Sequence, residues 1–541
     1  MRIALAQINP TVGDLSHNTS LIIDNIKKGK SESADLVVFP ELCLTGYPPE
    51  DLVLLPHFIQ QVEDCIKKIA EHTKGIAAIV GLPRLSKKGS EKHLHISAAI
   101  LEDGKLIGYQ DKMLLPTYDV FDERRFFEPG TEAKLWDIQG HKIAVTICED
   151  IWKFGGLITE TNYPFDPVEE YIQQKPDVLI NISSSPFSGK KPTVRMEICS
   201  KIAKSLNCPV IYCNQVGGND SLIFDGRSLY VGKRGELQKE GRCFAEDFFL
   251  VDTHKSYPSK IMEIDPIADL YQALVLGVRD YFHKQNFSKA CLGLSGGIDS
   301  ALVACVAVDA LGKDNVLAVL MPSRYSSQGS VDDSVTLAKA LGIDYKVIPI
   351  EKPFQTFLEL LDPFFEGKES DVTEENMQAR IRGLLLMALS NKHGYIVLST
   401  GNKSELAMGY STLYGDTCGG LNVLGDVTKS QVFAISKWLK IIPEAIIEKP
   451  PSAELRPDQK DSDTLPDYEI IDHVVQDYVE KHLSPLKISE KHNYPIEVVS
   501  RIVKAIHRNE YKRRQGAPLL RVSEKTFSVG RRFPIVHQWE G

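Results

Sequence analysis

The chain has 541 residues, and at roughly 100 to 200 residues per domain this length predicts two to four domains or two large ones. Hydrophobic residues make up 43% of the chain and charged residues 25%, which are ordinary globular values and exclude a collagen-like, low-complexity or wholly disordered protein. The formal net charge of -9 disfavours a dedicated nucleic-acid binder and a protein held on an anionic membrane.

Cysteine spacing and hydropathy indicate the cellular compartment. The 10 cysteines never form a C-x-x-C pair, which argues against a zinc ribbon or a disulfide framework and favours a reducing cytosol. The apolar stretch Ile3–Ala6 ends at Gln7, too early for a secretory signal, and no apolar run reaches the roughly 18 residues that cross a bilayer. We therefore expect a cytoplasmic protein without a membrane partner.

Residues 1–252 have the pattern of a layered α/β domain. Short β-branched runs such as RIALAQI, DLVVFP, KIAVTIC and DVLINIS predict strands. An amphipathic stretch at helical spacing lies between the first two runs, with Asn18 or Ser20 as its expected N-cap. Residues 253–266 are polar, contain two prolines and show no period, so we place a linker there.

Residues 267–541 begin with alternating helices and strands, which is typical of a doubly wound parallel sheet. A helix over IADLYQALVLGVRDYFHKQ precedes the strand ACLGL, a glycine-rich turn and an apolar helix that ends near Leu311. A second unit of the same kind follows, with the strand NVLAVLMPS, a helix closed by Gly342 and the strand DYKVIPI.

Three reactive side chains each follow a predicted strand in the first domain: Glu41 after DLVVFP, Lys112 after KLIGYQD and Cys148 at the end of KIAVTIC. The carboxyl ends of parallel strands gather functional groups, so these three could converge. A nearby ammonium favours a thiolate and a carboxylate can carry its proton to a leaving amine, which is the chemistry of amide hydrolysis through a thioester. Taken singly, each is more simply a buried cysteine or a solvated loop residue.

The surrounding segments VVFPELCLTGYPPEDL, YQDKMLLPTYDVFDERRFFEPG and TICEDIW closely resemble the nitrilase-type glutaminase domain over nearly all of residues 1–252. The resemblance implies an α/β/β/α sandwich in which Glu41 is the general base, Lys112 stabilises the oxyanion and Cys148 is the nucleophile. Glu123 is a further acid in the second segment, and its role stays open, with support of the base as one interpretation.

The segment SSSPFSGKK resembles the loop with which this family holds glutamine. By this resemblance Ser185 and Lys191, together with Tyr118, orient the α-amino and carboxylate groups of the substrate. A polar surface loop is the alternative interpretation of Ser185 and Lys191.

A second constellation lies in CLGLSGGIDSALVACVAV, where a strand, a glycine turn and a helix start follow each other directly. Gly296 and Gly297 allow the backbone to approach an anion, and the helix that begins near Asp299 directs free N–H groups at the same spot. No Walker motif and no G-x-G occurs in the chain, so P-loop phosphoryl transfer and a Rossmann dinucleotide site lose support. The carboxylate of Asp299 suggests Mg²⁺ between ATP phosphates, whereas a plain strand-to-helix turn is the alternative.

The segment SGGIDS after an apolar strand resembles the signature of the ATP pyrophosphatases, which transfer AMP from ATP to an oxygen nucleophile. Three later segments, ENMQARIRGLLLMALSN, LSTGNKSELAMGYSTLYGDTCGGLNVLGDVTKSQVF and KPPSAELRPDQKDSDTLPDYEIID, resemble the synthetase domain of the glutamine-dependent NAD⁺ synthetase family, an adenine nucleotide α-hydrolase-like fold. This resemblance assigns ATP contacts to Gly293, Leu294, Ser295, Gly296, Gly297, Ile298, Asp299, Ser300 and Thr400. It assigns deamido-NAD⁺ contacts to Asn376, Glu405 and Lys512, and Mg²⁺ to Asp299 and Glu405.

Simpler interpretations compete with the assignments in the second domain. Asn376 could cap a helix, Thr400 could lie in a turn, and Glu405 could be a first-turn acid favoured by the helix dipole. Lys512 could belong to a solvated basic face, and the negative net charge argues against an RNA contact there.

Four other polar residues receive no catalytic role from the sequence. Asp416 and Asp426 lie in a glycine-rich loop and stay unassigned substrate-loop candidates. His93 and His95 lie on one face of a predicted strand, but without a third ligand we interpret them as structural.

Together the resemblances imply ATP-dependent amidation of deamido-NAD⁺ through an acyl-adenylate, with ammonia released from L-glutamine and with Mg²⁺ as cofactor. Ammonia in bulk water is protonated and no longer nucleophilic, so we expect it to pass internally between the sites. The resemblance also implies a homo-oligomer whose partners are small molecules and not nucleic acid. An amidotransferase acting on a purine nucleotide or an amino acid, and a non-catalytic protein of the same folds, are the alternatives.

Overall fold

The computed structural model describes residues 1–87, 89–156 and 161–541. The chain forms two compact units, Met1–Asp265 and Pro266–Gly541. The first is built on two six-stranded sheets and the second on one five-stranded sheet. Residues 256–265 belong to no helix or strand.

The two large sheets of the first unit are mixed. The first has the order β14-β1-β2-β3-β4-β5, with bounds Asp247–Asp252, Arg2–Gln7, Leu36–Val38, Ala77–Leu85, Leu94–Glu102 and Lys105–Asp111. The second has the order β13-β12-β9-β8-β7-β6, with bounds Leu237–Glu240, Leu229–Val231, Val210–Asn214, Val178–Ser183, His141–Ile147 and Leu135–Ile138. A hairpin of β10 and β11 covers Val216–Asn219 and Leu222–Asp225. Strands β1, β2 and β3 are parallel, as are β7, β8 and β9.

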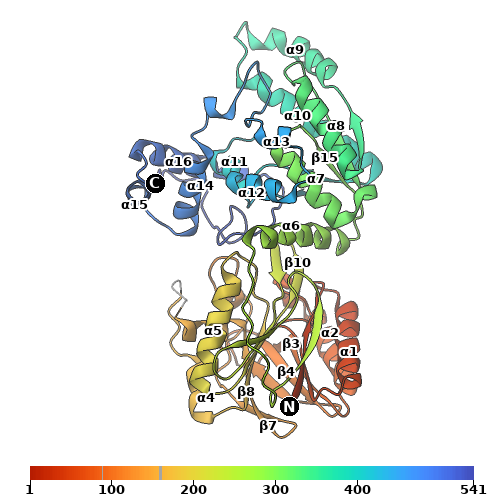
Figure 1. Cartoon of the computed structure of the whole chain (residues 1–541), viewed down its shortest axis with the longest axis vertical. Helices are drawn as coiled ribbons and strands as arrows, with labels where there is room; N and C mark the ends of the chain where they lie inside the picture. Colours follow the sequence, from red (N-terminus) through yellow and green to blue (C-terminus); the bar gives the residue numbers. More distant parts are fainter. Residues whose placement is uncertain (88, 157–160) are drawn as a thin grey trace. The chain divides into compact units, whose positions relative to one another are not determined.

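The sheets pack face to face and helices cover their outer sides. On β8, Ile180 and Ile182 share a core with Val38 of the other sheet, whereas Leu179 packs with Ile198 of a helix. Successive strand residues point to opposite faces, so this apolar run is buried on both sides. Figure 1 shows α1 and α2 along one side of the unit and α4 and α5 along the other. The expected α/β/β/α sandwich is therefore confirmed. The helices are α1 (Leu15–Ser31), α2 (Pro56–Glu71), α3 (Trp152–Gly155), α4 (Pro167–Gln174) and α5 (Lys191–Leu206).

The start of α1 differs from the prediction. The helix begins at Leu15, and its N-cap is Asp14, whose carboxylate accepts a hydrogen bond from the backbone N–H of His17. Asn18 and Ser20 lie inside the helix, so both were wrong as caps. The physical reason is that the buried Asn18 amide instead hydrogen-bonds to the backbone of the preceding loop, which leaves the free N–H groups of the first turn to an acid further upstream.

The second unit is built on a fully parallel sheet. Its order is β17-β16-β15-β18-β19, with bounds Asp344–Val347, Val316–Leu320, Ala290–Gly293, Ile396–Ser399 and Leu421–Asn422. Strand order reverses at β15, and every residue of β16 is buried because helices cover both faces. This confirms the predicted doubly wound sheet. Around it lie α6 (Pro266–His283), α7 (Ile298–Leu311), α8 (Gln328–Leu341), α9 (Glu351–Phe365), α10 (Val372–His393), α11 (Lys403–Met408), α12 (Lys429–Leu439) and α13 (Glu444–Glu448).

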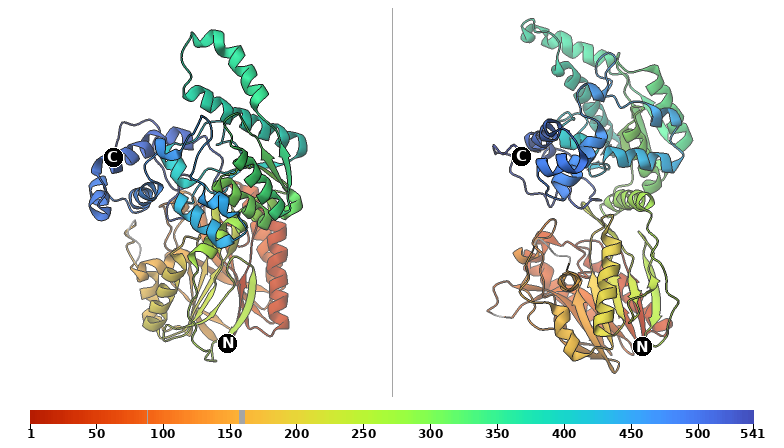
Figure 2. Two further views of the ribbon diagram at one scale, coloured as in Figure 1. Left: turned by 45° about the horizontal axis from the view of Figure 1, so that its top comes forward. Right: turned by 60° about the vertical axis from the view of Figure 1, so that its left-hand side comes forward.

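The last helices form a subcluster within this unit, seen in blue in Figure 2. They are α14 (Tyr468–Val475), α15 (Pro485–His492), α16 (Ile496–Arg508) and α17 (Glu510–Arg513). Apolar side chains of α14, α15 and α16 share a core with Leu406 of α11. Beside it the buried ammonium of Lys403 pairs with Asp426 at 3.0 Å and with Glu480 at 2.7 Å. These contacts hold α11 in place, and α11 carries Glu405.

Candidate active site

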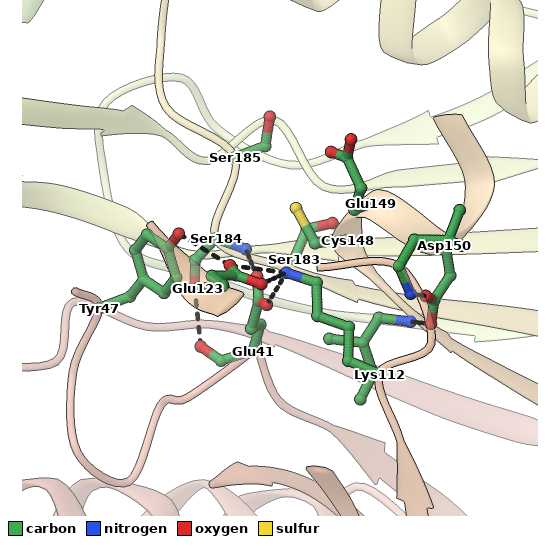
Figure 3. Close-up of polar contacts among 12 residues, drawn as sticks. Glu41, Tyr47, Lys112, Glu123, Cys148, Glu149, Asp150, Ser183, Ser184 and Ser185 are labelled. Carbon is green, nitrogen blue, oxygen red and sulfur yellow. Dashed lines mark hydrogen bonds and ion pairs between the residues drawn. The ribbon is translucent and has the colours of Figure 1, made fainter. Parts of the chain in front are cut away.

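In the first unit the predicted Glu41, Lys112 and Cys148 converge at the carboxyl ends of β2, β5 and β7. The Lys112 Nζ donates to Glu41 Oε1 at 2.7 Å and to Glu123 Oε1 at 2.8 Å, and all three side chains are buried. The other oxygen of Glu41 accepts the backbone N–H of Ser184 at 3.0 Å. Figure 3 shows these carboxylates around the ammonium, with the Cys148 sulfur beside them.

Burial and the neighbouring charges shift the pKa values of the groups in this cluster. Burial raises the pKa of Glu123 to about 8, against the lowering effect of Lys112, and Glu41 raises it further. Burial alone would lower the pKa of Lys112, but the two carboxylates outweigh it and keep the pKa above its usual range. Burial and Glu41 also raise the pKa of the Cys148 thiol, with Lys112 opposing. The thiol is therefore protonated in the free protein and needs a base to become a nucleophile, and Glu41 is the carboxylate whose charge acts on it most strongly.

The chain turns sharply at Cys148. Its φ is +42, a left-handed conformation that is unusual for a residue with a side chain, and strain of this kind is often found at functional sites. Asp150 supports the turn, because one oxygen accepts the backbone N–H of Ile147 and the other accepts those of Met113 and Leu114. One buried carboxylate thus joins the strand that carries Cys148 to the segment that follows Lys112.

Two of the three predicted glutamine-binding residues, Tyr118 and Lys191, interact with a further acid, Glu149. Tyr118 donates its hydroxyl to Glu149 Oε1 at 2.9 Å, and Tyr163 donates to the same oxygen at 3.1 Å. Lys191 begins α5 with its ammonium 4.1 Å above the Trp152 ring, and its charge lowers the pKa of Glu149, which burial raises. Ser185 is only 2% exposed, so the alternative of a solvated surface loop is wrong for it.

Sequence reasoning missed Glu149 and Asp150. Both stand in the segment TICEDIW, directly after Cys148, and Asp150 lies three residues beyond Ile147, whose backbone N–H its carboxylate accepts, which is one half of a capping box. That spacing could have indicated Asp150. The partners of Glu149 are more than ten residues away, so no local pattern could have indicated its role.

In the second unit a cavity of about 650 Å³ opens at the carboxyl ends of β15 and β18. It lies at the point where the strand order reverses, which is where doubly wound sheets bind ligands. The predicted residues that line it are Gly293, Leu294, Ser295, Gly297, Ile298, Asp299, Ser300, Asn376, Thr400, Glu405 and Lys512.

Gly296 is the exception among the predicted ATP contacts, because it is not among the lining residues. Its φ is +80, and a side chain there would come within 2.4 Å of the Ser330 carbonyl oxygen. Gly296 therefore lets the loop turn and approach Ser330. At Gly297 a side chain would meet only the Ser295 hydroxyl, at 3.4 Å, so this glycine leaves the backbone open toward the cavity.

The helix start behind these glycines is suited to anions. Gly297 is the N-cap of α7 and offers no side chain to cap it, so the first N–H groups remain for a ligand. Ser300 is buried and donates its hydroxyl to the Gly297 carbonyl at 3.0 Å, which holds the loop, while Ser295 is exposed to the cavity.

Asp299 and Glu405 converge on one cation position, which the Lys429 ammonium holds at 2.5 Å and 3.3 Å from their oxygens. Asn402 caps α11 and donates to the other oxygen of Asp299 at 2.9 Å. Burial raises the pKa of Glu405 to about 8, Lys429 lowers it and Asp299 raises it. The alternative considered for Glu405 also holds, since it is an acid in the first turn of α11, where it closes a capping box with Asn402. Lys429 and Asn402 were not foreseen from the sequence.

Asn376 and Lys512 both hold the loop of residues 409–418. Asn376 lies within α10, whose N-cap is Asp371, so a capping role for Asn376 is wrong, and its oxygen accepts the Thr412 hydroxyl at 2.8 Å. Lys512 donates to the carbonyl oxygens of residues 409 and 411 at 2.7 and 2.9 Å, which excludes a purely solvated face. Asp416 accepts the Thr412 N–H and lines the cavity, and burial raises its pKa to about 6.

Asp426 and the histidine pair lie apart from both sites. Asp426 is buried and accepts hydrogen bonds from the backbone N–H groups of Val522 and Ser523, which is a structural role. His95 contacts the Glu128 carbonyl at 2.7 Å, in agreement with a structural interpretation. Among the residues that the structure describes, no three histidine, cysteine or acidic side chains form a group that could hold a metal ion. The described helices include none that is long and apolar enough to span a membrane.

In a comparison with known proteins, each of the two units matches a family model. Residues 2–254 match the family model for carbon-nitrogen hydrolases and residues 270–516 match that for NAD synthase. A glutamine-dependent NAD(+) synthetase from Synechocystis sp. is 45% identical over 98% of both chains, and one from Thermotoga maritima is 40% identical over 100% of this chain and 99% of its own.

Two solved structures extend the match to three dimensions. The glutamine-dependent NAD+ synthetase from Acinetobacter baumannii, in complex with ADP, superimposes with a TM-score of 0.77 at 39% identity and covers 99% of this chain and 98% of its own. The enzyme of that name from Cytophaga hutchinsonii has the same fold, with a TM-score of 0.86 at 20% identity. Since whole-length relatives at this identity carry both units in one chain, this chain belongs to the glutamine-dependent NAD(+) synthetase family.

Proposed function

We propose that this protein makes NAD⁺ by ATP-dependent amidation of deamido-NAD⁺, with ammonia that its first unit releases from L-glutamine and passes on internally. An acyl-adenylate is the intermediate, and the other products are glutamate, AMP and pyrophosphate. The observation that carries the proposal is that one chain holds both a buried cysteine beside a carboxylate and an ammonium, and a glycine-lined cavity with a free helix start. The names of whole-length relatives support it.

In the first unit Glu41 takes the Cys148 proton as the sulfur attacks the carboxamide of glutamine. The Lys112 ammonium supports the developing oxyanion, and Glu41 returns the proton to the departing ammonia. Glu123 shares the Lys112 ammonium and accepts the Tyr47 hydroxyl at 3.0 Å, so this second acid helps to hold the ammonium beside the base. Water then attacks the thioester, again with help from Glu41, and releases glutamate.

Glutamine is held by groups of opposite charge. The Glu149 carboxylate, kept in place by Tyr118 and Tyr163, pairs with the α-ammonium. The hydroxyl of Ser185 and the ammonium of Lys191 pair with the α-carboxylate.

Replacing Glu149 with glutamine keeps acceptors for both tyrosines but removes the charge that faces the substrate ammonium. Because a hydrogen bond to a charged group contributes about 1.5 to 3 kcal/mol, we expect KM for glutamine to rise roughly tenfold to hundredfold with a smaller change in kcat. Steady-state glutaminase kinetics measure this, with Tyr163→Phe as a control that keeps the charge. A fall in kcat at unchanged KM would instead place Glu149 in the chemical step.

In the second unit the phosphates of ATP bind the N–H groups at the start of α7 and the open backbone at Gly297. The Gly293–Ser300 segment and Thr400 contact ATP, and Asn376, Glu405 and Lys512 contact deamido-NAD⁺. The nicotinate carboxylate attacks the α-phosphorus and pyrophosphate leaves, after which ammonia displaces AMP.

Asp299 and Glu405 would hold Mg²⁺ on the ATP side of this cavity. Their carboxylates already share one cation, and Mg²⁺ commonly takes one or two carboxylates and completes its shell with phosphate oxygens and water. The ion supplies neutralisation of charge on the phosphates. Lys429, which shares both carboxylates, remains beside the anionic substrate.

Stoichiometry tests the whole proposal. Purified protein given Mg²⁺, ATP, deamido-NAD⁺ and glutamine should form NAD⁺, AMP and pyrophosphate in equal amounts, with at least as much glutamate. Parallel assays with XMP or aspartate as acceptor test the two rival amidotransferases. Release of AMP with either of these, and none with deamido-NAD⁺, would contradict the proposal, and so would tight binding of deamido-NAD⁺ without turnover.

Two further proposals concern the oligomeric state and the cellular location of the protein. We propose that the protein works as a homo-oligomer and in the cytoplasm, where its substrates are found. Light scattering at micromolar concentration would give a mass above that of one chain if the first holds. Fractionation of cells that express the protein tests the second.

A further inference from the structure

A buried arginine holds the loop that carries Ser185. Arg195 lies on α5, is 1% exposed, and pairs with Asp225 at the end of β11. Its Nη1 donates to both oxygens of Asp225 at 2.7 and 2.9 Å. Its Nη2 donates to the carbonyls of Ser185 at 2.8 Å and Pro186 at 3.2 Å, and its Nε donates to Ser185 Oγ at 3.3 Å. These five hydrogen bonds engage all three nitrogens of the guanidinium, so the group is held within the protein.

The bond from Nε fixes the polarity of the Ser185 hydroxyl. A serine oxygen has two lone pairs and one proton, and a charged donor on one lone pair favours an orientation in which the proton points elsewhere. The backbone of Ser185 is also held, since its N–H donates to Asn214 Oδ1 at 3.0 Å. The Tyr212 hydroxyl lies beside the same serine, and burial raises its pKa, so it stays neutral.

The ligand expected at this serine is an anion. A carboxylate accepts hydrogen bonds and donates none, so it binds a hydroxyl only when the hydroxyl offers its proton. Figure 3 shows the side chains of Ser185 and Glu149 both pointing away from the Lys112 ammonium. The buried charge pair contacts Ser185 and not the Glu41 and Lys112 pair beside Cys148.

We propose that Arg195, neutralised by Asp225, is a positioning residue that makes Ser185 a hydrogen-bond donor to the substrate's α-carboxylate. The pair thereby sets the preference of the glutaminase site for amides that carry an α-carboxylate. This inference rests on the proposed glutaminase function. A buried ion pair is a costly way to brace a loop, because apolar residues of similar volume often stabilise as well or better, so a role in binding accounts for its presence.

Arg195→Lys keeps the charge beside Asp225 but offers three donors in place of five. We expect KM for glutamine to rise about tenfold with kcat changed less than about twofold, which is the signature of lost ground-state binding. Ser185→Ala should give a similar rise. In the double variant Arg195→Lys should raise KM by less than about a further twofold over Ser185→Ala alone, because the effects of two residues that act through one interaction are not additive. Tyr212→Phe is the matched control, since it removes a neutral hydroxyl beside the same serine and should change KM little.

A second readout separates positioning from general disturbance. Iodoacetamide carries an amide but no α-carboxylate, so its rate of Cys148 alkylation, followed by mass spectrometry, should match wild type in Arg195→Lys. If Arg195→Lys folds poorly, the paired change Arg195→Met with Asp225→Asn avoids an unpaired buried charge and should show the same KM shift.

The outcomes are distinct. Equal losses in alkylation and glutamine hydrolysis, additive effects with Ser185→Ala, or an equal effect of Tyr212→Phe would each reduce the pair to a structural brace. If wild-type protein releases no glutamate from glutamine, the proposed function fails before any variant is made. If wild type is active and Arg195→Lys matches it, only this inference fails.

Discussion

Replacing Cys148 with alanine is expected to abolish NAD⁺ formation from glutamine and to leave formation from added ammonium salt intact. We propose the sulfur atom as the nucleophile of the first reaction, and loss of a nucleophile typically lowers the rate by at least about 10⁴-fold. The ammonium-driven reaction needs only the second unit, which has its own core and its own sheet. NAD⁺ formation with each nitrogen source, measured on the same preparation, gives the result.

A matched control is available in the same unit. Cys65 is partly buried and lies on the outer helix α2, whereas Cys148 follows the strand β7. Cys65→Ala should therefore change neither activity. Equal loss of both activities in Cys148→Ala would refute the division of labour between the units. Retained glutamine-driven synthesis would refute the assignment of the nucleophile.

Asp299→Asn is expected to remove NAD⁺ formation with either nitrogen source while glutamine hydrolysis remains. The change keeps the size of the side chain, but it takes away one of the two carboxylates that share a cation with Lys429. Since stabilisation of phosphate charge by a bound cation amounts to several kcal/mol, the rate should fall roughly a hundredfold to a thousandfold. AMP release and glutamate release, followed in one assay, separate the two reactions.

Asp309 provides the comparison for this experiment. It lies on the same helix α7 and accepts the Tyr271 hydroxyl at 2.6 Å, but it does not line the cavity. Asp309→Asn should leave NAD⁺ formation within about threefold of wild type, because the carboxamide oxygen can still accept the Tyr271 hydroxyl and the residue does not line the cavity. Unchanged synthesis in Asp299→Asn would overturn the role of this carboxylate in the ATP site.

The parts of both sites that follow a strand or begin a helix were open to prediction. Glu41, Lys112 and Cys148 each come just after a strand-length apolar run. Such runs can be recognised in a sequence because side chains alternate across a sheet. The turn formed by the glycines before α7 could be predicted because a tight turn before a helix needs residues without a side chain. The two glycines nevertheless have different tasks, since Gly296 makes room for Ser330 whereas Gly297 faces the cavity.

The groups that orient these residues were not open to prediction. Arg195 and Asp225 are 30 residues apart, on a helix and a hairpin that look ordinary in sequence. The Tyr118 and Glu149 pair spans 31 residues, and the contact between Lys429 and Asp299 spans 130. A sequence pattern reports short-range periodicity, so it cannot state which distant polar groups share one buried space.

By itself the sequence determined the order of the elements, the two α/β units and the identity of the reactive side chains, because propensity, apolar period and glycine position are local properties. Tertiary structure alone decided that two carboxylates, Glu41 and Glu123, share the Lys112 ammonium, and that Arg195 binds the Ser185 hydroxyl. These outcomes depend on burial and on charges brought within 3 to 4 Å, where removal of water strengthens every electrostatic interaction. Such distances arise only when sheets pack face to face and bring residues from remote parts of the chain together.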